Sequence, residues 1–232
     1  MKIQGVNITG GIRLDPPVAP TPTGPSKFVV GAPFNDDPSN SGSVYVYNTD
    51  GTGEQKITAS DGAASDYFGG SVAISDTHIV AGAWDSNSTK GAVYVYNTDG
   101  TGEVKITASD GANYDKFGYR VGMSDTHVVV SAPGDDEIGS SESGSVYVYN
   151  TDGTGEQKIT ASDRAQGDEF GESVAVSGSK IVVGAPHNDD IPDNSGSAYI
   201  YNLDGTGEVK ITASDAAVND YFGLSVAISD TK

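Results

Sequence analysis

One stretch of twenty residues recurs four times in this chain, and this repetition constrains the fold more than any other feature. The first copy, GSVYVYNTDGTGEQKITASD, spans 42–61, and near-identical copies follow at 91–110, 144–163 and 196–215. In each copy an apolar run precedes an Asp-Gly pair, which a second run around a central isoleucine then follows. Two β-strand signals on either side of Asp-Gly predict a β-hairpin. The chain is therefore predicted to be a repeat protein made of antiparallel strands.

The full repeat is longer than the hairpin and contains four strand signals. Equivalent phenylalanines mark it at intervals of 49, 53 and 52 residues: Phe68, Phe117, Phe170 and Phe222. Its predicted strands, in the second copy, are Ser71–Ser75, His78–Ala83, Ala92–Asn97 and Glu103–Ser109. About fifty residues and four strands per unit are typical of a β-propeller blade. The first of these strands carries small residues on one face, which suits the innermost position.

The two ends of the repeat region fall at the same phase of the repeat. The first unit begins at Lys27 with its second strand, and the last unit ends at Lys232 after its first strand. Lys27 and Lys232 both align with His78. We therefore expect an all-β, four-bladed β-propeller of four-stranded blades, closed by the C-terminal strand completing the N-terminal blade. Two alternatives stay open: the units are a piece of a larger ring, or two chains share one ring.

Two short motifs carry a family resemblance over residues 27–232. Phe68-Gly69 is followed by Val80-Ala81-Gly82-Ala83, and Phe170-Gly171 by Val183-Gly184-Ala185-Pro186, while Val30-Gly31-Ala32-Pro33 opens the region. These motifs resemble the FG-GAP repeats of integrin α-subunit propellers and their bacterial relatives. The resemblance implies a β-propeller.

The chain departs from that family in two ways. Integrin propellers have seven blades, whereas this chain has four repeats. The family's Asp-rich calcium loop between the first and second strands is replaced by short turns such as Ser75-Asp76-Thr77. One carboxylate in a tight turn cannot supply the six or more oxygens that calcium takes. Calcium at the family site is therefore not expected.

The N-terminal residues stand outside the repeat. Residues 1–14 are interpreted as an anchoring arm, 15–26 as a Pro-rich linker and 27–232 as the propeller. The linker holds five of the ten prolines, which favours a semi-rigid, extended spacer. A disordered tail is the competing interpretation, but it does not explain the apolar residues of the arm. These are Ile3, Val6, Ile8, Ile12 and Leu14.

Composition excludes several classes of partner. The net charge of −19, from 32 acidic and 13 basic residues, argues against binding nucleic acid or inserting into an anionic membrane. The chain contains no cysteine, so disulfides, thiolate metal sites and thiol catalysis are excluded. No apolar segment at the N-terminus is long enough for a signal peptide or a membrane span.

All length variation between the repeats falls in the loop that joins the second and third strands. The interval from Gly31 to Tyr47, and its equivalents, takes values of 16, 14, 18 and 17. Variable loops on a constant scaffold are where recognition tends to reside. The candidate binding residues are the aspartates of these loops: Asp36, Asp37, Asp85, Asp135, Asp136, Asp189 and Asp190. They predict a site for a cation, a basic protein surface or a glycan held through calcium; solvated turns in which Asp bonds its own backbone are the alternative.

Signals of an enzyme are missing from the sequence. It has no HExxH, GxSxG or phosphate-binding motif, and paired aspartates recur in three repeats rather than forming one acid/base pair. We therefore expect no catalytic residues and no required cofactor, with calcium as the one ion to consider. A hydrolase that uses the acidic face is the third-ranked hypothesis.

The leading functional hypothesis is a structural or interaction module of a larger assembly. Near-identical repeats, an acidic surface and a short arm running into a proline-rich spacer resemble virion proteins of marine bacteriophages, such as fibre, tail or decoration subunits. This implies residence in a virion, with protein partners bound through residues 1–26 and a glycan or host-surface receptor bound by the propeller. The alternative is a secreted or cell-surface, calcium-dependent adhesin.

Overall fold

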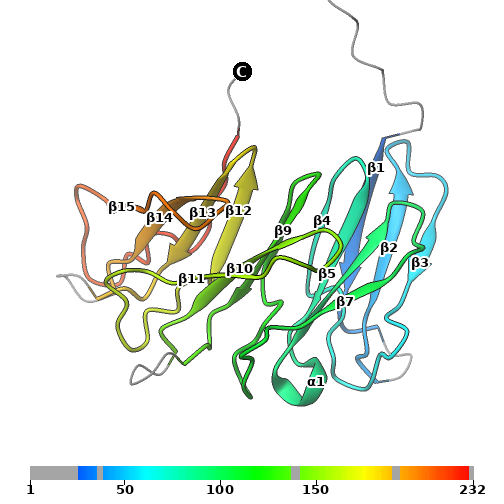
Figure 1. Cartoon of the computed structure of the whole chain (residues 1–232), viewed down its shortest axis with the longest axis horizontal. Coiled ribbons are helices and arrows are strands. Elements are labelled where there is room, and N and C mark those ends of the chain that lie inside the picture. Colours follow the sequence, from blue (N-terminus) through cyan, green and yellow to red (C-terminus); the bar gives the residue numbers. More distant parts are fainter. Residues whose placement is uncertain (1–25, 36–38, 137–141, 190–193, 230–232) are drawn as a thin grey trace, which may run out of the picture.

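The computed structural model describes residues 26–35, 39–136, 142–189 and 194–229, and in these ranges the fold is built from four antiparallel sheets (Figure 1). Each sheet is one repeat, and we call the sheets blades one to four. The strands of blades one and two are β1 (Lys27–Ala32), β2 (Ser43–Asn48), β3 (Gln55–Ile57), β4 (Ser71–Ile74), β5 (His78–Ala83), β6 (Ala92–Asn97) and β7 (Val104–Ile106). Those of blades three and four are β8 (Val121–Met123), β9 (His127–Ala132), β10 (Ser145–Asn150), β11 (Gln157–Ile159), β12 (Ser173–Ser177), β13 (Lys180–Ala185), β14 (Ser197–Asn202) and β15 (Val209–Ile211).

The repeat unit predicted from sequence is confirmed. Blades two to four each contain four strands in chain order, and blade one contains only β1, β2 and β3, as its truncated repeat predicts. Fourth strands are shorter than expected: β7 covers only Val104–Ile106 of the predicted Glu103–Ser109. A single turn of helix, α1 (Ser86–Thr89), occupies the loop between β5 and β6. No helix in the described ranges is long and apolar enough to cross a membrane.

The Asp-Gly hairpins close as the sequence predicts. In the turn between β2 and β3, the Asp50 carboxylate accepts hydrogen bonds from the backbone N–H and the hydroxyl of Thr52, at 2.9 and 2.6 Å. These bonds lower the pKa of Asp50. Gly51 and Gly53 take positive φ angles of 81° and 71°, which glycine adopts without strain. The acidic residue is therefore engaged in the turn itself.

The hydrophobic core lies between the blades. Three separate clusters of buried side chains fill the three joints: blades one and two, two and three, and three and four. A phenylalanine sits at the centre of each cluster, edge-on to two tyrosines of the following blade. At the middle joint, Phe117 lies 5.3 Å from the ring of Tyr147 and 6.1 Å from that of Tyr149. Each blade therefore depends on its neighbours for burial of its faces.

The FG and GAP motifs recur together because their glycines touch across these joints. A Cβ built on Gly31 would overlap the backbone oxygen of Gly69, and one built on Gly82 would overlap that of Gly118. Gly69 N–H in turn donates to Gly82 O at 2.9 Å, within its own blade. The FG glycine thus contacts the GAP glycine of the preceding blade and bonds the GAP glycine of its own blade. A side chain on the GAP glycine of the preceding blade would push the two blades apart.

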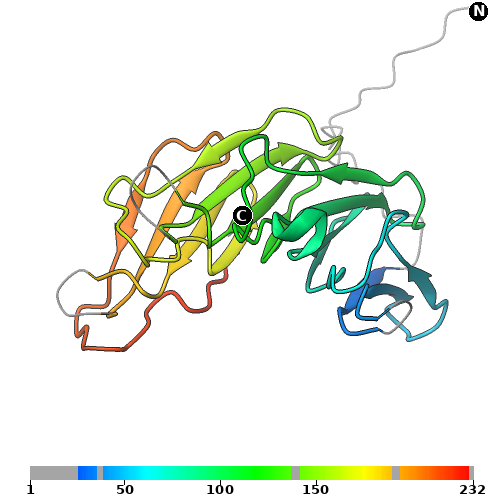
Figure 2. The same ribbon diagram turned by 90° about the horizontal axis from the view of Figure 1, so that it is seen from below.

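The four blades form an arc whose ends do not meet (Figure 2). The inner strands β4, β8 and β12 contact one another in this order, β1 contacts β4, and no comparable contact joins β1 to β12. The expected closure by the C-terminal strand is therefore not observed: β1 pairs only with β2, and residues 225–229 form no strand. Figure 1 places the segment that contains them beside blade four, at the opposite end of the arc from β1. The segment follows blade four directly, and the arc separates it from blade one.

Candidate functional site

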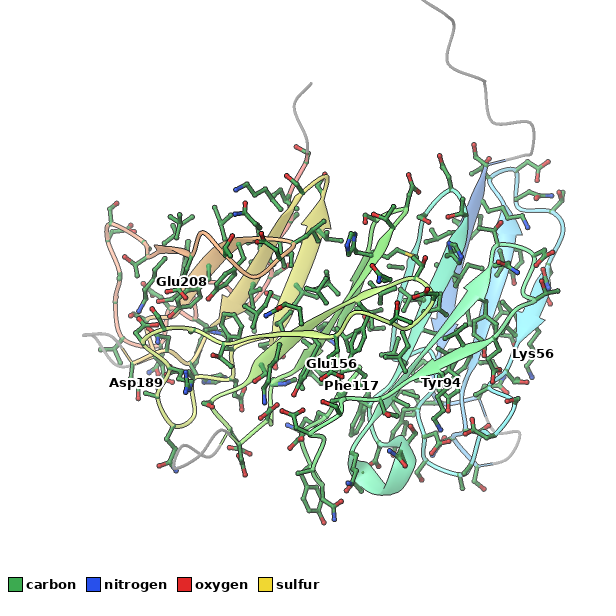
Figure 3. All side chains as sticks on the ribbon, in the orientation of Figure 1. Lys56, Tyr94, Phe117, Glu156, Asp189 and Glu208 are labelled. Atoms are coloured by element: carbon green, nitrogen blue, oxygen red, sulfur yellow. The ribbon has the colours of Figure 1, made fainter. Side chains whose placement is uncertain are left out.

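The loops that join the second and third strands of each blade carry the aspartates predicted to bind a partner. The structure describes Asp85, Asp135, Asp136 and Asp189, whereas Asp36, Asp37 and Asp190 lie outside the described residues. The predicted anchoring residues Ile3, Val6, Ile8, Ile12 and Leu14 also lie outside them. Figure 3 shows Asp189 on the loop side of blade four. The four described aspartates have three different environments.

Asp135 is part of the joint between blades two and three. It is buried, and its carboxylate accepts a hydrogen bond of 2.6 Å from the Tyr147 hydroxyl and lies 2.9 Å from Lys158 Nζ. Lys158 also pairs with Asp110, which follows the last strand of blade two, at 2.8 Å. Asp115 is buried at the same joint, and this burial raises its pKa to about 6. Asp135 therefore bonds the two side chains of blade three that also reach Asp110 of blade two, rather than facing a partner.

Asp136 and Asp189 are exposed and close their own loops. The Asp136 carboxylate accepts the backbone N–H of Glu142 at 2.6 Å, and that of Asp189 accepts the N–H of Asn194 at 2.8 Å. A side chain that bonds the backbone of its own loop is the expected behaviour of Asp in turns. One carboxylate oxygen of each residue is thereby engaged in loop structure.

Asp85 has a different setting, at the joint between blades one and two. It lines a hollow of about 500 Å³ together with Asp61, Asp66, Asn87 and Lys105. Asp61 and Lys105 form an ion pair of 2.6 Å, and the hydrogen bond from Lys105 lowers the pKa of Asp61. Burial raises the pKa of Asp66, although the Ala63 N–H donates to its carboxylate at 2.7 Å. The hollow thus contains three carboxylates and one ammonium group.

An aromatic stack is formed by residues next in the chain to the lining of this hollow, and sequence reasoning missed it. The rings of Tyr67 and Trp84 are nearly parallel, with centroids 4.8 Å apart, and Phe34 packs edge-on against Tyr67 at 5.6 Å. Phe34 is 71% exposed, and the other two are half-buried. Tyr67 follows Asp66 and Trp84 precedes Asp85 in the chain, so the stack adjoins the lining of the hollow. We call Phe34, Tyr67, Trp84, Asp66 and Asp85 the aromatic–acidic site.

The repeats show that this site differs from the other joints. The position of Trp84 is occupied by proline in the other three units, at Pro33, Pro133 and Pro186, and Trp84 is the single tryptophan of the chain. Where Tyr67 stands, the next two units have Lys116 and Glu169, and the last has Tyr221, which packs against His187 instead of a tryptophan. A residue that breaks a near-identical repeat is a signal that sequence comparison within the chain could have found. Among the described residues, the three-ring stack occurs only at the joint of blades one and two.

Within the ranges that the structure describes, no group of three or more His, Asp or Glu side chains is placed to hold a metal ion. The recurring aspartates at the ends of the fourth strands are used in blade-to-blade bonds instead: Asp61 accepts from Tyr94, Asp110 from Tyr147 and Asp163 from Tyr199. Their constant spacing reflects this structural use.

Comparison with known proteins identifies the repeat. A family model described as the FG-GAP repeat matches residues 52–96, 101–149, 154–201 and 206–232, together more than half of the chain. A search of curated proteins found no match. The bacteriophage resemblance of the N-terminal residues therefore receives no support from these comparisons. FG-GAP propellers are generally non-enzymatic, which agrees with the absence of catalytic motifs from the sequence.

Proposed function

Because this chain belongs to the FG-GAP repeat family, we propose that it is a non-enzymatic interaction module that binds a cationic group of a partner protein at the aromatic–acidic site. The observation that carries the proposal is the Tyr67–Trp84 stack, whose chain neighbours Asp66 and Asp85 line a hollow with carboxylates. It interrupts repeats that are otherwise almost identical, at a joint whose equivalents lack the stack. A departure confined to one joint favours a role in recognition over a role in the scaffold.

The chemistry of the site suits a lysine or arginine side chain. Aromatic faces attract a cation through their quadrupole, and most strongly when the ring is that of tryptophan. Asp66 and Asp85 add negative charge next to the rings, and Asp61 is neutralised by Lys105. The net charge of −19 further attracts a basic partner over distance. The aromatic faces would therefore hold the stem and charge of the ligand, and the carboxylates would orient it.

Fluorescence of the single tryptophan provides a direct test, because Trp84 lies in the site. Titration with a short Lys/Arg-rich peptide should change its emission with a saturable curve that weakens as salt is raised. Tyr67→Lys should reduce affinity about tenfold, since it removes one ring of the stack and adds a positive charge. Lysine already stands at the equivalent Lys116, where φ is 59° against 55° at Tyr67, so the variant should fold.

A matched control uses Tyr114, which is 72% exposed and for which no ring contact with Phe34, Tyr67 or Trp84 is found among the described residues. Tyr114→Ala should bind the peptide as the unmodified chain does. Equal affinity of the unmodified chain and Tyr67→Lys would overturn the proposal. Neutral oligosaccharides and calcium are separate arms of the same titration: a change in Trp84 emission with a neutral sugar, or only with calcium present, would favour the glycan-binding adhesin instead.

We further propose that residues 1–26 attach the propeller to a larger assembly, a virion or a cell surface. The proposal is supported by the apolar residues Ile3, Val6, Ile8, Ile12 and Leu14, followed by a linker with five prolines. Deletion of residues 1–26 should abolish incorporation into the particle or surface layer, while the circular dichroism of the repeat region stays unchanged. Retained incorporation of the deleted chain would exclude this role, whatever the result of the peptide titration.

A further inference from the structure

Blade one is the only described sheet without an inner strand, and the surface that such a strand would cover is exposed. Phe28 and Val30 of β1 are 39% and 45% exposed. Their equivalents in blade two, Ile79 and Ala81, are completely buried. One edge and one face of blade one therefore have the sequence of a buried joint but no neighbouring strand in the part of the chain that the structure describes.

The opposite end of the arc exposes the complementary half of a joint. Ile211 of β15 is 39% exposed, whereas its equivalents Ile106 and Ile159 are buried by the blade that follows each of them. Phe222 is only half-buried, unlike the fully buried Phe170. Gly223 N–H has no hydrogen-bond partner in the described ranges, although Gly69 N–H bonds to Gly82 O. Blade four thus exposes the side chains that the following blade buries at each internal joint.

Polar groups at the two ends match in the same manner. At each internal joint an aspartate accepts from a tyrosine and a lysine of the next blade, as Asp163 does from Tyr199 and Lys210. The repeat equivalents at the open ends are Asp215 on blade four and Tyr45 and Lys56 on blade one. Asp215 has no partner in the described residues, and Lys56 reaches only Asn35 Oδ1, at 3.4 Å. Among the described residues, the carboxylate at one end therefore faces no cation, and the cation at the other faces no carboxylate.

A second polar link repeats this pattern. Glu103, Glu156 and Glu208 each accept two hydrogen bonds from a serine of the preceding blade; for Glu156 these come from the backbone N–H and hydroxyl of Ser109, at 3.1 and 2.5 Å. The equivalents at the open ends are Ser214 on blade four and Glu54 on blade one. Glu54 accepts only the hydroxyl of Tyr47 in the described residues, and Ser214 bonds to none of them. Figure 3 labels Lys56 at one end of the arc and Glu208 at the other.

The missing inner strand is also present in the sequence. Residues 225–229 read SVAIS, which is identical to residues 71–75, the stretch that supplies the inner strand β4. In the structure they form no strand and are largely exposed. They lie at the end of the arc remote from β1 (Figures 1 and 2). The edge that needs a strand and the segment that matches it therefore belong to opposite ends of the same molecule.

We propose that two copies of this chain join head to tail into one closed ring, in which residues 225–229 of each copy form the inner strand on β1 of the other. Two complementary ends on one molecule generate a ring or an open filament, depending on the angle between copies. Propellers have four to eight blades, so two arcs of four blades give a ring within this range and three do not. Each contact then reproduces a joint that the chain already forms three times internally.

Mass measurement of the chain under native conditions, with a charge-swap pair of variants, tests the proposal. The unmodified chain should have the mass of two copies. Asp215→Lys and Lys56→Asp should each shift the mass to one copy at micromolar concentration, because each places like charges at both contacts. The double variant Asp215→Lys, Lys56→Asp should restore the dimer. Asp76→Lys, at an exposed carboxylate that bonds to no described residue, should remain dimeric.

A cross-link distinguishes pairing between copies from closure within one. The chain has no cysteine, so Glu54→Cys with Ser214→Cys introduces a single thiol pair at positions whose internal equivalents, Glu103 and Ser60, are hydrogen-bonded. Oxidation should give a covalent dimer in denaturing electrophoresis, lost on reduction. A monomeric mass for the unmodified chain, a cross-link confined to one chain, or an open-ended series of larger masses would each overturn the proposal. Circular dichroism of every variant should match the unmodified chain, which separates loss of pairing from loss of folding.

Discussion

Lys105 Nζ lies 2.6 Å from Asp61 Oδ2, and this ion pair connects the outer strand of blade two to the end of blade one. The Tyr94 hydroxyl donates to the same carboxylate at 2.7 Å. Equivalent bonds recur at the next two joints, through Asp110 and Asp163. The constant spacing of this aspartate in every repeat predicts a structural bond in the turn between blades, and the structure confirms it.

Replacing this aspartate should weaken the first joint. Asp61→Ala is expected to lower the free energy of unfolding by about 1–2 kcal/mol, mainly because the Tyr94 hydroxyl loses its acceptor. The Lys105 pair contributes less, since both of its side chains are substantially exposed. Urea denaturation of the variant measures the loss. Asp76→Ala should change stability by less than about 0.5 kcal/mol; equal losses for the two variants would show that the fastening contributes nothing.

A side chain on a GAP glycine should force two blades apart. Gly82→Ala places a Cβ against the backbone oxygen of Gly118, which cannot move aside as a flexible side chain would. We expect this variant to lower the free energy of unfolding by about 3 kcal/mol. Ser131 occupies the same position in blade three and already carries a Cβ. Ser131→Ala should therefore lower the free energy of unfolding by only about 1 kcal/mol, because it removes the hydrogen bond that the Ser131 hydroxyl accepts from Arg120 N–H. The thermal midpoints of the two variants give the comparison.

The phenylalanine at the centre of a joint should contribute more to the free energy of unfolding than any single polar bond. Phe117 is buried against Tyr147 and Tyr149, so Phe117→Ala should cost about 3–5 kcal/mol through the cavity that it leaves. Phe117→Leu, which retains most of the apolar volume, should cost less than half as much. Denaturant titration of both variants checks the order, and a larger loss for leucine than for alanine would contradict this account of the core.

Stability should depend on pH through Asp115, whose pKa burial raises to about 6 in the folded chain. The folded state then binds more protons than the unfolded state between about pH 4 and pH 6, so this group reduces stability as pH rises through that window. Asp115→Asn removes the effect and can still accept the Ala112 N–H. We expect the variant to be more stable than the unmodified chain at pH 7, by about 1–3 kcal/mol, and nearly equal to it at pH 4.

The measurement is the difference in unfolding free energy between the two proteins at pH 4, 5, 6 and 7. Taking the difference cancels Asp61, Asp110 and Asp163, whose lowered pKa values give the opposite slope. A difference that stays constant over this range would show that Asp115 titrates as an ordinary surface carboxylate.

Much of the candidate site could not be read from the sequence. The aspartates of the variable loops cannot be distinguished by residue type. Asp135 is nevertheless buried at a joint, whereas Asp136, the next residue, is exposed and closes its loop. Which of them faces solvent depends on the position of Lys158 and Tyr147 in another strand. The stack of Tyr67 and Trp84 joins residues 17 positions apart, which the pairing of β4 with β5 brings near each other, and Phe34 of blade one packs against it.

The sequence by itself determined the repeat, the strand order and the identity of the family, because hairpins and blades are local: alternating strands and Asp-Gly turns specify them within about fifty residues. Only the tertiary structure decided how the blades are arranged. Matching phases at Lys27 and Lys232 suggested a ring closed within one chain, but phase says nothing about the angle between successive blades. That angle is fixed by how Phe68, Phe117 and Phe170 pack in the joints, and in this chain it leaves β1 and residues 225–229 at opposite ends of an arc.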